Sequence, residues 1–309
     1  MGDVYLLFGK NGWIGGKLIE LLKQQGKTVY LSDVRTQMRE SVIAEIDKYK
    51  PTHVLNAAGV TGRPNVDWCE DHRQETIRAN VIGCLTIADL CEEYKIHHLL
   101  YATGCIFEYD AKHTIGGVGF TEEEYANFHG SYYSHTKAMV EEMLREYKYS
   151  CVLRVRMPIS DDLASRNFLT KIIKYDRVVN VPNSMTTLTD MLPVSLIMAE
   201  RKLTGIYNFC NPGAISHNEC LDMYKKYVDA DYTYQNFTLD EQAQILKAGR
   251  SNNTLDHAKL CAALPDVHIP EIHVAVEGVF QRMRKHLEEE VDANGNKLWP
   301  KNLPKRVAK

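Results

Sequence analysis

The sequence has no surplus of positive charge, no metal-binding cysteine spacing and no long hydrophobic run. Its 309 residues carry 37 Lys and Arg against 40 Asp and Glu, a formal net charge of −3. This balance excludes the basic surface of a nucleic-acid-binding protein. The eight cysteines form no Cys-x-x-Cys pair, and the histidines lack the spacing of a zinc site, so no metal is expected. The apolar runs are far too short to cross a bilayer, so no membrane partner is expected.

Neither a secretory signal peptide nor a myristoylation site is expected. Met1-Gly-Asp3 leads directly into an apolar run, without the regions of a secretory signal peptide. The Ser or Thr of a myristoylation site is absent as well. Cys84 and Cys91 share one face of an expected helix and are interpreted as small buried apolar residues. Together with an ordinary content of 44% hydrophobic and 25% charged residues, this predicts a globular protein in the reducing cytoplasm.

Short apolar runs alternate with amphipathic helical stretches through the first half of the chain, which is typical of a parallel sheet covered on both faces. We therefore predict an α/β fold, a Rossmann-type doubly wound parallel sheet with a smaller C-terminal substrate-binding segment. The predicted strands span residues 4–8, 28–31, 53–56, 98–102, 151–155, 178–181 and 205–209. The predicted helices span residues 13–25, 38–50, 69–95, 131–146 and 193–202, and capping boxes at Ser216–Glu219 and Thr238–Glu241 open two more.

These elements predict a division of the chain. Residues 1–155 form the dinucleotide-binding domain, and residues 178–204 return to it. Residues 156–177 and 205–286 form the substrate-binding segment, which packs on the carboxyl edge of the sheet, where ligands of such folds bind. Beyond Leu287 the chain becomes charged and bears Gly, Asn and Pro, so residues 287–309 are predicted to be a mobile tail.

A glycine-rich turn, Gly9-Lys-Asn-Gly12-Trp-Ile-Gly15-Gly16, lies between the first predicted strand and helix. Its glycines permit a tight turn and close approach of a pyrophosphate to the helix N-terminus, whose partial charge is positive. Trp13 and Ile14 begin that helix and are expected beside the cofactor. The small residues Asn56, Ala57 and Ala58 after the third strand allow an adenine to lie against the backbone. These residues predict a dinucleotide site.

The choice between NADPH and NADH depends on the end of the second strand. Asp33 stands there, where a carboxylate accepts hydrogen bonds from the ribose hydroxyls and repels a 2′-phosphate. Arg35 and Arg39 follow at once and can neutralise that phosphate. Because the arginines outnumber the acid, we predict NADPH, with NADH as the alternative.

Tyr133 and Lys137 are four residues apart on a predicted helix and therefore share a face. Lys137 can hold the nicotinamide ribose and, together with the positive charge of the cofactor, lower the pKa of the phenol. Tyr133 can then protonate a carbonyl oxygen as hydride reaches its carbon. Thr103, at the end of a strand, supplies a positioning hydroxyl. This arrangement is the hydride-transfer apparatus of a short-chain dehydrogenase/reductase.

Cys105 follows Thr103 by two residues, so on an extended backbone both side chains point to one face. Reduction of a ketone has no use for a thiol. A thiol can, however, act as acid or base on the hydrogens of the carbons that flank a keto group. With Tyr133 stabilising the enolate oxygen, the cysteine predicts epimerisation of a keto-sugar before its reduction.

Several motifs together resemble the nucleotide-rhamnose synthase/epimerase-reductase family, from about residue 4 to residue 265. The motifs are Gly12-Trp-Ile-Gly15-Gly16, Thr61–Cys69, Thr103-Gly-Cys105, Tyr133-Ser-His-Thr-Lys137, Arg154–Pro158, Arg166–Lys171, Val181–Met185 and Arg250–Asn253. The resemblance implies an extended short-chain dehydrogenase/reductase fold. It also implies conversion of UDP-4-keto-6-deoxy-D-glucose to UDP-β-L-rhamnose by 3,5-epimerisation and 4-keto reduction.

The resemblance also implies roles for single residues. Cys105 and Lys171 would be the acid–base pair of the epimerisation, and Thr103, Tyr133 and Lys137 the reduction triad. The positions that would line the nucleotide-sugar site are Arg63, Asn167, Asn183 and Arg250. A homodimer is an assembly that the resemblance allows. The chain departs from the family pattern at Asp33-Val-Arg35 and in the tail after Leu287.

Other functions of the same scaffold remain as alternatives. A nucleotide-sugar dehydratase would need an Asp-Glu pair after Thr103, where Gly104 and Cys105 stand. A GDP-sugar epimerase-reductase would pair the cysteine with a histidine. A dTDP-linked substrate is an alternative to the UDP-linked one, since the residues do not distinguish the carriers. A non-catalytic regulatory subunit would be expected to lose the triad, which is intact here.

Overall fold

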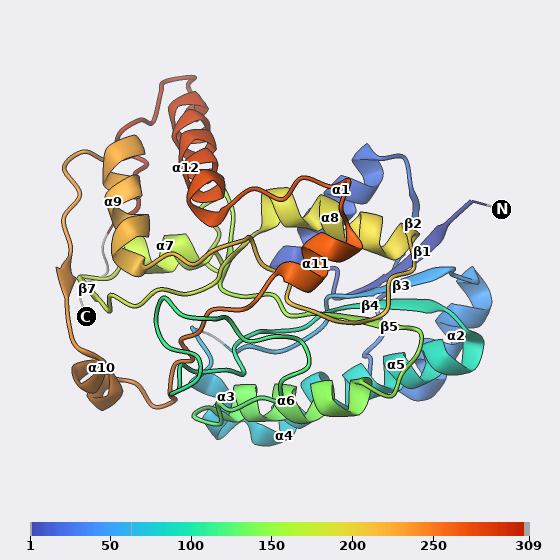
Figure 1. The fold of residues 1–309 in the computed structure, drawn as a ribbon. Coiled ribbons are helices and arrows are strands. Elements are labelled where there is room, and N and C mark those ends of the chain that lie inside the picture. Colours follow the sequence, from blue (N-terminus) through green and yellow to red (C-terminus); the bar gives the residue numbers. More distant parts are fainter. Residues whose placement is uncertain (1, 63, 306–309) are drawn as a thin grey trace.

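A six-stranded parallel sheet forms the centre of the computed structural model, which describes residues 2–62 and 64–305 (Figure 1). Its strands are β1 (Val4–Phe8), β2 (Thr28–Leu31), β3 (His53–Asn56), β4 (His97–Tyr101), β5 (Ser150–Leu153) and β9 (Gly205–Tyr207). They lie in the order β2-β1-β3-β4-β5-β9, and every pair is parallel. The order reverses between β1 and β3, the place where doubly wound sheets bind ligands. The predicted fold class is confirmed.

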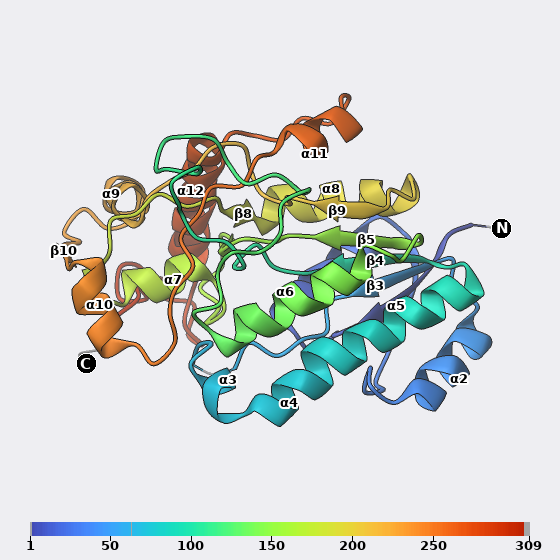
Figure 2. The ribbon, with the colours of Figure 1, turned by 60° about the horizontal axis from the view of Figure 1, so that its bottom comes forward.

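Helices cover both faces of this sheet (Figures 1 and 2). On one face lie α2 (Arg39–Tyr49), α5 (Gly83–Tyr94) and α6 (Tyr132–Leu144). On the other face lie α1 (Trp13–Gln24), α8 (Leu188–Glu200) and α11 (Ala258–Ala263). All residues of β3, β4 and β5 are buried, because strands covered on both sides meet no solvent.

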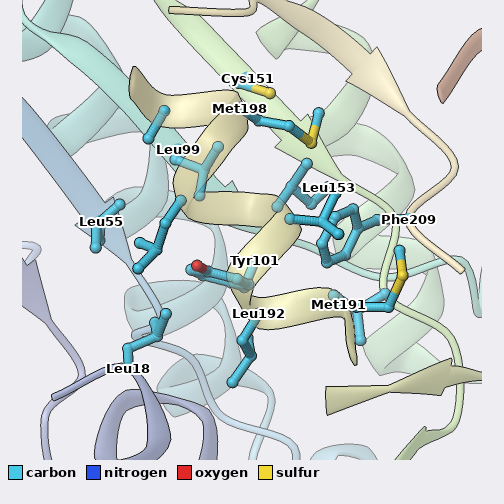
Figure 3. Packing of buried hydrophobic residues seen from close by; sticks show 14 of the residues in the cluster. Leu18, Leu55, Leu99, Tyr101, Cys151, Leu153, Met191, Leu192, Met198 and Phe209 are labelled. Carbon is cyan, nitrogen blue, oxygen red and sulfur yellow. The ribbon is translucent and has the colours of Figure 1, made fainter. Parts of the chain in front are cut away.

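The largest apolar cluster lies between the sheet and α8 (Figure 3). Leu55, Leu99 and Leu153, from three neighbouring strands, pack toward α8, and each is fully buried. Each such leucine stabilises the fold by roughly 1.5–3 kcal/mol through burial. The Tyr101 hydroxyl in this layer is hydrogen-bonded, since it lies 2.7 Å from Ser195 Oγ of α8. The carboxyl ends of the strands are thereby held on a rigid support.

A smaller lobe adjoins the sheet, at the left of Figure 1. It contains α7 (Phe168–Ile173), α9 (His217–Tyr227), β10 (Gln235–Asn236), α10 (Leu239–Ile245) and α12 (Ile272–Glu289). It also contains two short sheets, β7 (Arg177–Val178) with β10, and β6 (Pro158–Ile159) with β8 (Thr186–Thr187). Its own apolar cluster joins α7, α9 and α12. Both predicted capping boxes, at the starts of α9 and α10, are confirmed.

The long helix predicted over residues 69–95 is wrong. The segment folds as α3 (Trp68–Asp71), α4 (Arg73–Ile77), a π-helical turn η1 (Arg78–Ile82), and α5. His72 interrupts the helical backbone with φ −122° and ψ 51°. Asn80, inside the π-helical turn, hydrogen-bonds both the N–H and the carbonyl of Val60. That contact with a distant loop, which periodicity cannot reveal, accompanies the irregular turn.

Three predicted boundaries after residue 155 also differ from the structure. The strand expected at 178–181 does not return to the central sheet, because β7 pairs with β10 instead. Residues 205–207, assigned to the substrate-binding segment, form β9 at the edge of the central sheet. Helix α8 begins at Leu188, so Pro193 lies inside it and not in its first turn.

The tail after Leu287 was expected to be mobile, but its described part folds back onto the small lobe. The Arg284 guanidinium stacks on the Trp299 ring at 3.7 Å from its centroid. Asn302 donates a hydrogen bond to the Leu287 carbonyl at 2.8 Å, and Leu303 packs against the apolar cluster of the lobe. The aromatic and apolar side chains within this charged segment therefore hold it against the small lobe as far as Lys305.

Three buried histidines predict how stability depends on pH. Burial lowers the pKa of His97 and His217 to about 4 and that of His98 to about 3. The unfolded chain binds these protons from about pH 6.5 downward, whereas the native chain does not. Native stability is therefore full above pH 6.5 and falls as the pH drops toward 4, by up to about 1.4 kcal/mol per pH unit for each histidine.

We expect His98→Gln to flatten this dependence. Denaturant unfolding measured between about pH 6.5 and pH 4.5 should give a slope lower than the parent's by about 1.4 kcal/mol per pH unit. The same substitution at the exposed His268 serves as the control. An unchanged slope in His98→Gln would contradict burial of this imidazole in its neutral form.

Candidate active site

The glycine-rich turn lies directly against the chain that follows β3. A Cβ atom built on Gly9 would stand 2.5 Å from the Ala57 carbonyl carbon and 2.6 Å from the Ala58 nitrogen. A Cβ on Gly15 would stand 2.2 Å from the Gly9 oxygen. Gly9 also has φ +87°, which favours glycine. The two segments predicted to hold the dinucleotide, around Gly9 and around Asn56, therefore meet at the point where strand order reverses.

Helix α1 begins at Trp13 without any side chain capping its N-terminus and without an acidic residue in its first turn. Gly12, at the N-cap, is exposed. The Trp13 indole donates a hydrogen bond to Asp162 at 3.0 Å, and Lys17 forms an ion pair with the same carboxylate at 2.6 Å. Ile14 packs on the main core. Free backbone N–H groups at an exposed helix start suit a pyrophosphate.

A salt bridge that the sequence did not reveal lies at the edge of this turn. The Lys10 ammonium stands 2.5 Å from the carboxylate of Asp33, which is 79% exposed. Arg35 is exposed nearby. Arg39, expected to help neutralise a 2′-phosphate, is instead bound by Asp89 and Glu93 of α5. The glycine-rich turn therefore places Lys10, and not Arg39, beside the carboxylate at the end of β2.

Thr103, Cys105 and Tyr133 come together beyond the end of β4. The Thr103 hydroxyl accepts a hydrogen bond from the Cys105 N–H at 3.1 Å and is hydrogen-bonded to the Tyr133 phenol. Cys105 and Tyr133 interact electrostatically, so the sulfur and the phenol lie near one another. The expected cause of this proximity was wrong, since β4 ends at Tyr101 and Cys105 lies in a turn. The turn, and not an extended strand, therefore places the Cys105 sulfur near Thr103 and Tyr133.

The charges of Tyr133 and Lys137 are set mainly by burial. Burial raises the pKa of Tyr133 well above its usual value, and Cys105 adds to the rise, while the Thr103 hydrogen bond opposes it. The lowering of this pKa expected from Lys137 together with the positive charge of a bound cofactor stays a prediction. Burial lowers the pKa of Lys137 itself, while Cys84 and Cys69 oppose that effect. Tyr133 therefore keeps its proton, as a proton donor must.

Lys137 lies beside the loop that leads out of β3. A Cβ on Gly59 would stand 3.8 Å from the Lys137 ammonium and 3.3 Å from the Asn80 side-chain oxygen. Asn80 is fully buried and fixes that loop through its two bonds to Val60. Sequence reasoning missed Asn80. An asparagine inside an amphipathic helical stretch was the available signal.

A second group of cations surrounds Lys171, on α7. The neighbouring charges of Arg166 and Arg250 add to the effect of burial, and together they lower the pKa of Lys171. Arg250 is held by Asp67 at 2.9 Å. Burial raises the pKa of Asp67, but the hydrogen bond and ion pair with Arg250 and backbone hydrogen bonds from Ala248 and Lys247 together outweigh burial and leave this pKa lowered. A lysine that gives up its proton readily suits acid–base chemistry.

Two predicted substrate residues have structural roles. Asn167 is fully buried, caps α7 by accepting a hydrogen bond from the Leu169 N–H, and donates to the carbonyls of Ser160 and Asp162. Asn183 is equally buried and accepts from the Asn253 N–H and from Arg156. All their polar atoms are engaged within the protein, so we do not assign them ligand contacts. Arg63 lies outside the described residues.

Arg156 is the main residue of this region that sequence reasoning left without a role. It is 1% exposed, and its Nη1 stands 3.1 Å from the Cys105 sulfur. Its guanidinium also reaches Asn253 and the Ser251 carbonyl, from the loop that carries Arg250. The available signal was a pair of arginines, Arg154 and Arg156, directly after the apolar strand β5.

Metal-binding side-chain clusters and membrane-spanning helices are both absent from residues 2–62 and 64–305. These residues contain no group of three or more His, Cys, Asp or Glu side chains arranged to hold a metal ion. No helix in the same ranges combines the length and the apolar character needed to span a bilayer. The eight cysteines are all free thiols, and seven of them are buried or partly buried.

The fold and the site together define an extended short-chain dehydrogenase/reductase. They combine a doubly wound sheet, a glycine-rich turn at the switch point of that sheet, and a Thr–Tyr–Lys group beyond β4. The sequence matches the family described as RmlD substrate binding domain over residues 4–283. The chain belongs to this family.

Individual relatives agree with this assignment. The chain is 58% identical over 265 residues to a bifunctional dTDP-4-dehydrorhamnose 3,5-epimerase/dTDP-4-dehydrorhamnose reductase of Arabidopsis thaliana, covering 85% of this chain and 88% of the relative. It is 56% identical to a trifunctional UDP-glucose 4,6-dehydratase/UDP-4-keto-6-deoxy-D-glucose 3,5-epimerase/UDP-4-keto-L-rhamnose-reductase of the same plant, but spans only 40% of that protein. The crystal structure of the L780 UDP-rhamnose synthase of Acanthamoeba polyphaga mimivirus matches with a TM-score of 0.87 and 38% identity, covering 91% of this chain and all of that one.

Proposed function

We propose that this protein is a bifunctional 3,5-epimerase/4-keto-reductase that converts UDP-4-keto-6-deoxy-D-glucose to UDP-β-L-rhamnose. The observation that carries the proposal is the placement of a thiol and a phenol, Cys105 and Tyr133, around one threonine hydroxyl. A plain ketone reductase has no need of the thiol. The names of the relatives, which describe both activities, support the same assignment.

The epimerisation uses the acidity that a 4-keto group confers on the hydrogens of carbons 3 and 5. Cys105 removes a proton from one face of the ring, and Tyr133 hydrogen-bonds the oxygen of the resulting enolate. Lys171, whose pKa is lowered by burial and by Arg166 and Arg250, delivers a proton to the other face. Exchange with water restores both groups before the next inversion.

The reduction then takes place at carbon 4 of the inverted sugar. Bound NADPH would supply the hydride. Tyr133 donates its phenolic proton to the carbonyl oxygen, Thr103 positions the phenol, and Lys137 holds the nicotinamide ribose and helps to return the proton. Arg250 and Arg63 are proposed to bind the diphosphate, since a guanidinium pairs with phosphate oxygens through two hydrogen bonds.

The residues around the glycine-rich turn favour NADPH over NADH. The ion pair with Lys10 offsets the negative charge of Asp33, and the exposed Arg35 is available to a 2′-phosphate. Trp13, Ile14 and the backbone of Gly9, Gly12 and Asn56–Ala58 would surround the rest of the dinucleotide. NADH is the secondary cofactor.

Removal of the Lys10 charge tests this preference. In Lys10→Ala, Asp33 would repel the 2′-phosphate, so the KM for NADPH should rise about tenfold, the size of one screened charge interaction. The KM for NADH should change much less. In Lys10→Ala/Asp33→Asn the NADPH value should recover, and failure to recover would contradict the proposed charge balance.

Product analysis tests the proposed function as a whole. Purified protein is incubated with UDP- or dTDP-4-keto-6-deoxy-glucose and with NADPH or NADH, and the products are identified by mass and chromatography. We expect UDP-β-L-rhamnose as the main product, formed fastest with NADPH. Preference for the dTDP-linked sugar would favour the alternative carrier, which the name of one relative supports. No turnover of either would favour a nucleotide-binding regulatory subunit.

The remaining expectations concern assembly and compartment. Eight free thiols suit a reducing compartment such as the cytoplasm. A homodimer is the proposed assembly, and sedimentation of the purified protein tests it. A monomer at the concentrations used for turnover would remove the dimer from the proposal without affecting the chemistry.

A further inference from the structure

The strongest feature that the proposed chemistry leaves unexplained is the buried cation Arg156. Arg156 lies between β5 and β6, its side chain contacts the Cys105 sulfur, and it is 1% exposed. Removing a charge from water is costly unless an opposite charge is placed beside it. Arg156 must therefore have a compensating partner.

No carboxylate supplies that partner within residues 2–62 and 64–305, where Arg156 forms no ion pair. Its Nε donates to the Asn253 side-chain oxygen at 3.2 Å, and its Nη2 donates to the Ser251 carbonyl at 2.7 Å and to the Asn183 side-chain oxygen. All three acceptors are neutral. The remaining contact, from Nη1, is to the Cys105 sulfur at 3.1 Å.

The titratable groups around Arg156 are neutral near pH 7. Burial raises the pKa of Cys210 to about 12 and also raises the pKa of Tyr109. Burial lowers the pKa of His217 to about 4. Around Cys105 itself, the interacting groups are Arg156 and the protonated phenol of Tyr133. Only the sulfur can provide a negative charge in contact with this guanidinium.

Hydrogen bonds from neighbouring asparagines hold Arg156 in a fixed position relative to the turn that carries Cys105. Asn253 accepts from Arg156 and donates to the Gly104 and Phe107 carbonyls, at 3.1 and 2.9 Å, on either side of Cys105. Asn183 accepts from Arg156 and from the Asn253 N–H. A rigid set of amides therefore aims one positive group at one sulfur, an arrangement that preorganises charge.

A neighbouring arginine provides the contrast. Arg154 is also fully buried, but it is neutralised by Glu141, with Nε–Oε2 and Nη2–Oε1 distances of 3.0 and 2.7 Å. Two arginines two residues apart thus have different partners. Arg154 is paired with a carboxylate, whereas Arg156 has a thiol in the equivalent position.

We propose that Arg156 is a positioning residue that holds the Cys105 sulfur and serves as the counter-charge of its thiolate during epimerisation. The inference rests on the proposed function. In the reaction the thiolate takes a hydrogen from the carbon beside the ketone, so a C–H bond breaks and an S–H bond forms. The electron pair moves to the ketone oxygen as the enolate, and Arg156 keeps its protons throughout. Solvent removes the thiol proton afterwards and regenerates the ion pair.

Alkylation of single cysteines tests the proposal without any sugar substrate. Folded protein is treated with iodoacetamide over a range of pH, and the modification rates of Cys105 and of the exposed Cys261 are followed by peptide mass spectrometry. Because the thiolate is the reactive form and Arg156 stands 3.1 Å from the Cys105 sulfur, we expect alkylation of Cys105 to reach its half-maximal rate at a lower pH than alkylation of Cys261. A midpoint at or above that of Cys261 would overturn the proposal.

Substitutions of Arg156 and Arg154 distinguish the effect of the Arg156 charge on Cys105 from an effect of side-chain packing. Arg156→Gln should raise the Cys105 midpoint by one to two pH units, roughly a 10- to 100-fold slower alkylation near pH 7, and Arg156→Lys should restore part of the shift. Arg154→Gln removes an equally buried arginine and should leave the Cys105 midpoint unchanged. Equal midpoints in Arg156→Gln and the parent would overturn the proposal, and if that variant does not fold, the comparison with Cys261 in the parent decides.

Two variants distinguish a wrong role for Arg156 from a wrong proposed function. If Cys105→Ala leaves exchange of the ring hydrogens intact, the epimerase function itself fails. If Cys105→Ala stops exchange but Arg156→Gln shifts neither the alkylation midpoint nor the pH profile of exchange, only the role of Arg156 fails.

Discussion

Replacement of Cys105 by alanine is expected to lower the turnover of UDP-4-keto-6-deoxy-D-glucose about a thousandfold, which is within the range that a positioned acid–base group contributes. In the proposed mechanism the Cys105 sulfur removes the ring hydrogens, and the Cys105 N–H is hydrogen-bonded to the Thr103 hydroxyl beside the Tyr133 phenol. The loss should appear at the first step. Exchange of the hydrogens at carbons 3 and 5 with D₂O, followed by mass spectrometry, should therefore fall by the same factor as turnover.

Replacement of a different cysteine shows whether the loss is specific to Cys105. Cys261 is exposed and lies on α11, so Cys261→Ala should retain the parent rate. Reduction of a sugar that is already epimerised, UDP-4-keto-L-rhamnose, should survive in Cys105→Ala and shows that the variant is folded. Parent-like exchange in Cys105→Ala would remove the epimerase half of the proposed function.

Tyr133→Phe should have the opposite effect to Cys105→Ala, with reduction lost and exchange of the ring hydrogens partly kept. Loss of the phenolic proton should slow reduction by a factor on the order of 10²–10⁴, because the alkoxide formed at carbon 4 then has no donor. Exchange of the ring hydrogens should persist in part, since Cys105 and Lys171 remain. The separation of the two rates, NADPH consumption against deuterium uptake, is the readout.

Tyr132, the preceding residue, offers the control for this substitution. It is only partly buried, and the Arg73 guanidinium stacks on its ring at 4.8 Å from the centroid. Tyr132→Phe keeps the ring and should retain both activities. If Tyr133→Phe reduces the sugar at the parent rate, then Tyr133 is not the proton donor.

The central fold could be predicted from the sequence because its signals are local. The first three strands and the glycine-rich turn follow from short apolar runs and the glycines between them. The capping boxes at Ser216 and Thr238 are also local, since each joins residues three apart. Local patterns failed where distant segments meet: Asn80 bonds Val60, 20 residues away, and β7 pairs with β10 instead of the central sheet.

The candidate site likewise has features that local sequence patterns predict and features that depend on contacts between distant segments. Tyr133 and Lys137 share a helical face, so their relation could be read from spacing alone. The ion pair of Lys10 with Asp33 and the contact of Arg156 with Cys105 join residues far apart in sequence, and no spacing predicts them. The asparagines at 167 and 183 were expected to touch the ligand. A conspicuous buried amide can equally serve as a helix cap or hold another side chain, and here both do so.

The most direct measurement of the central claim is the deuterium content of the product formed by the unaltered protein in D₂O with NADPH. A thiol and a phenol that act on the same keto-sugar ring should give UDP-rhamnose with deuterium at carbons 3 and 5 and the hydride from NADPH at carbon 4. A reduced product with no solvent deuterium at carbons 3 and 5 would contradict the account and leave a simple ketone reductase.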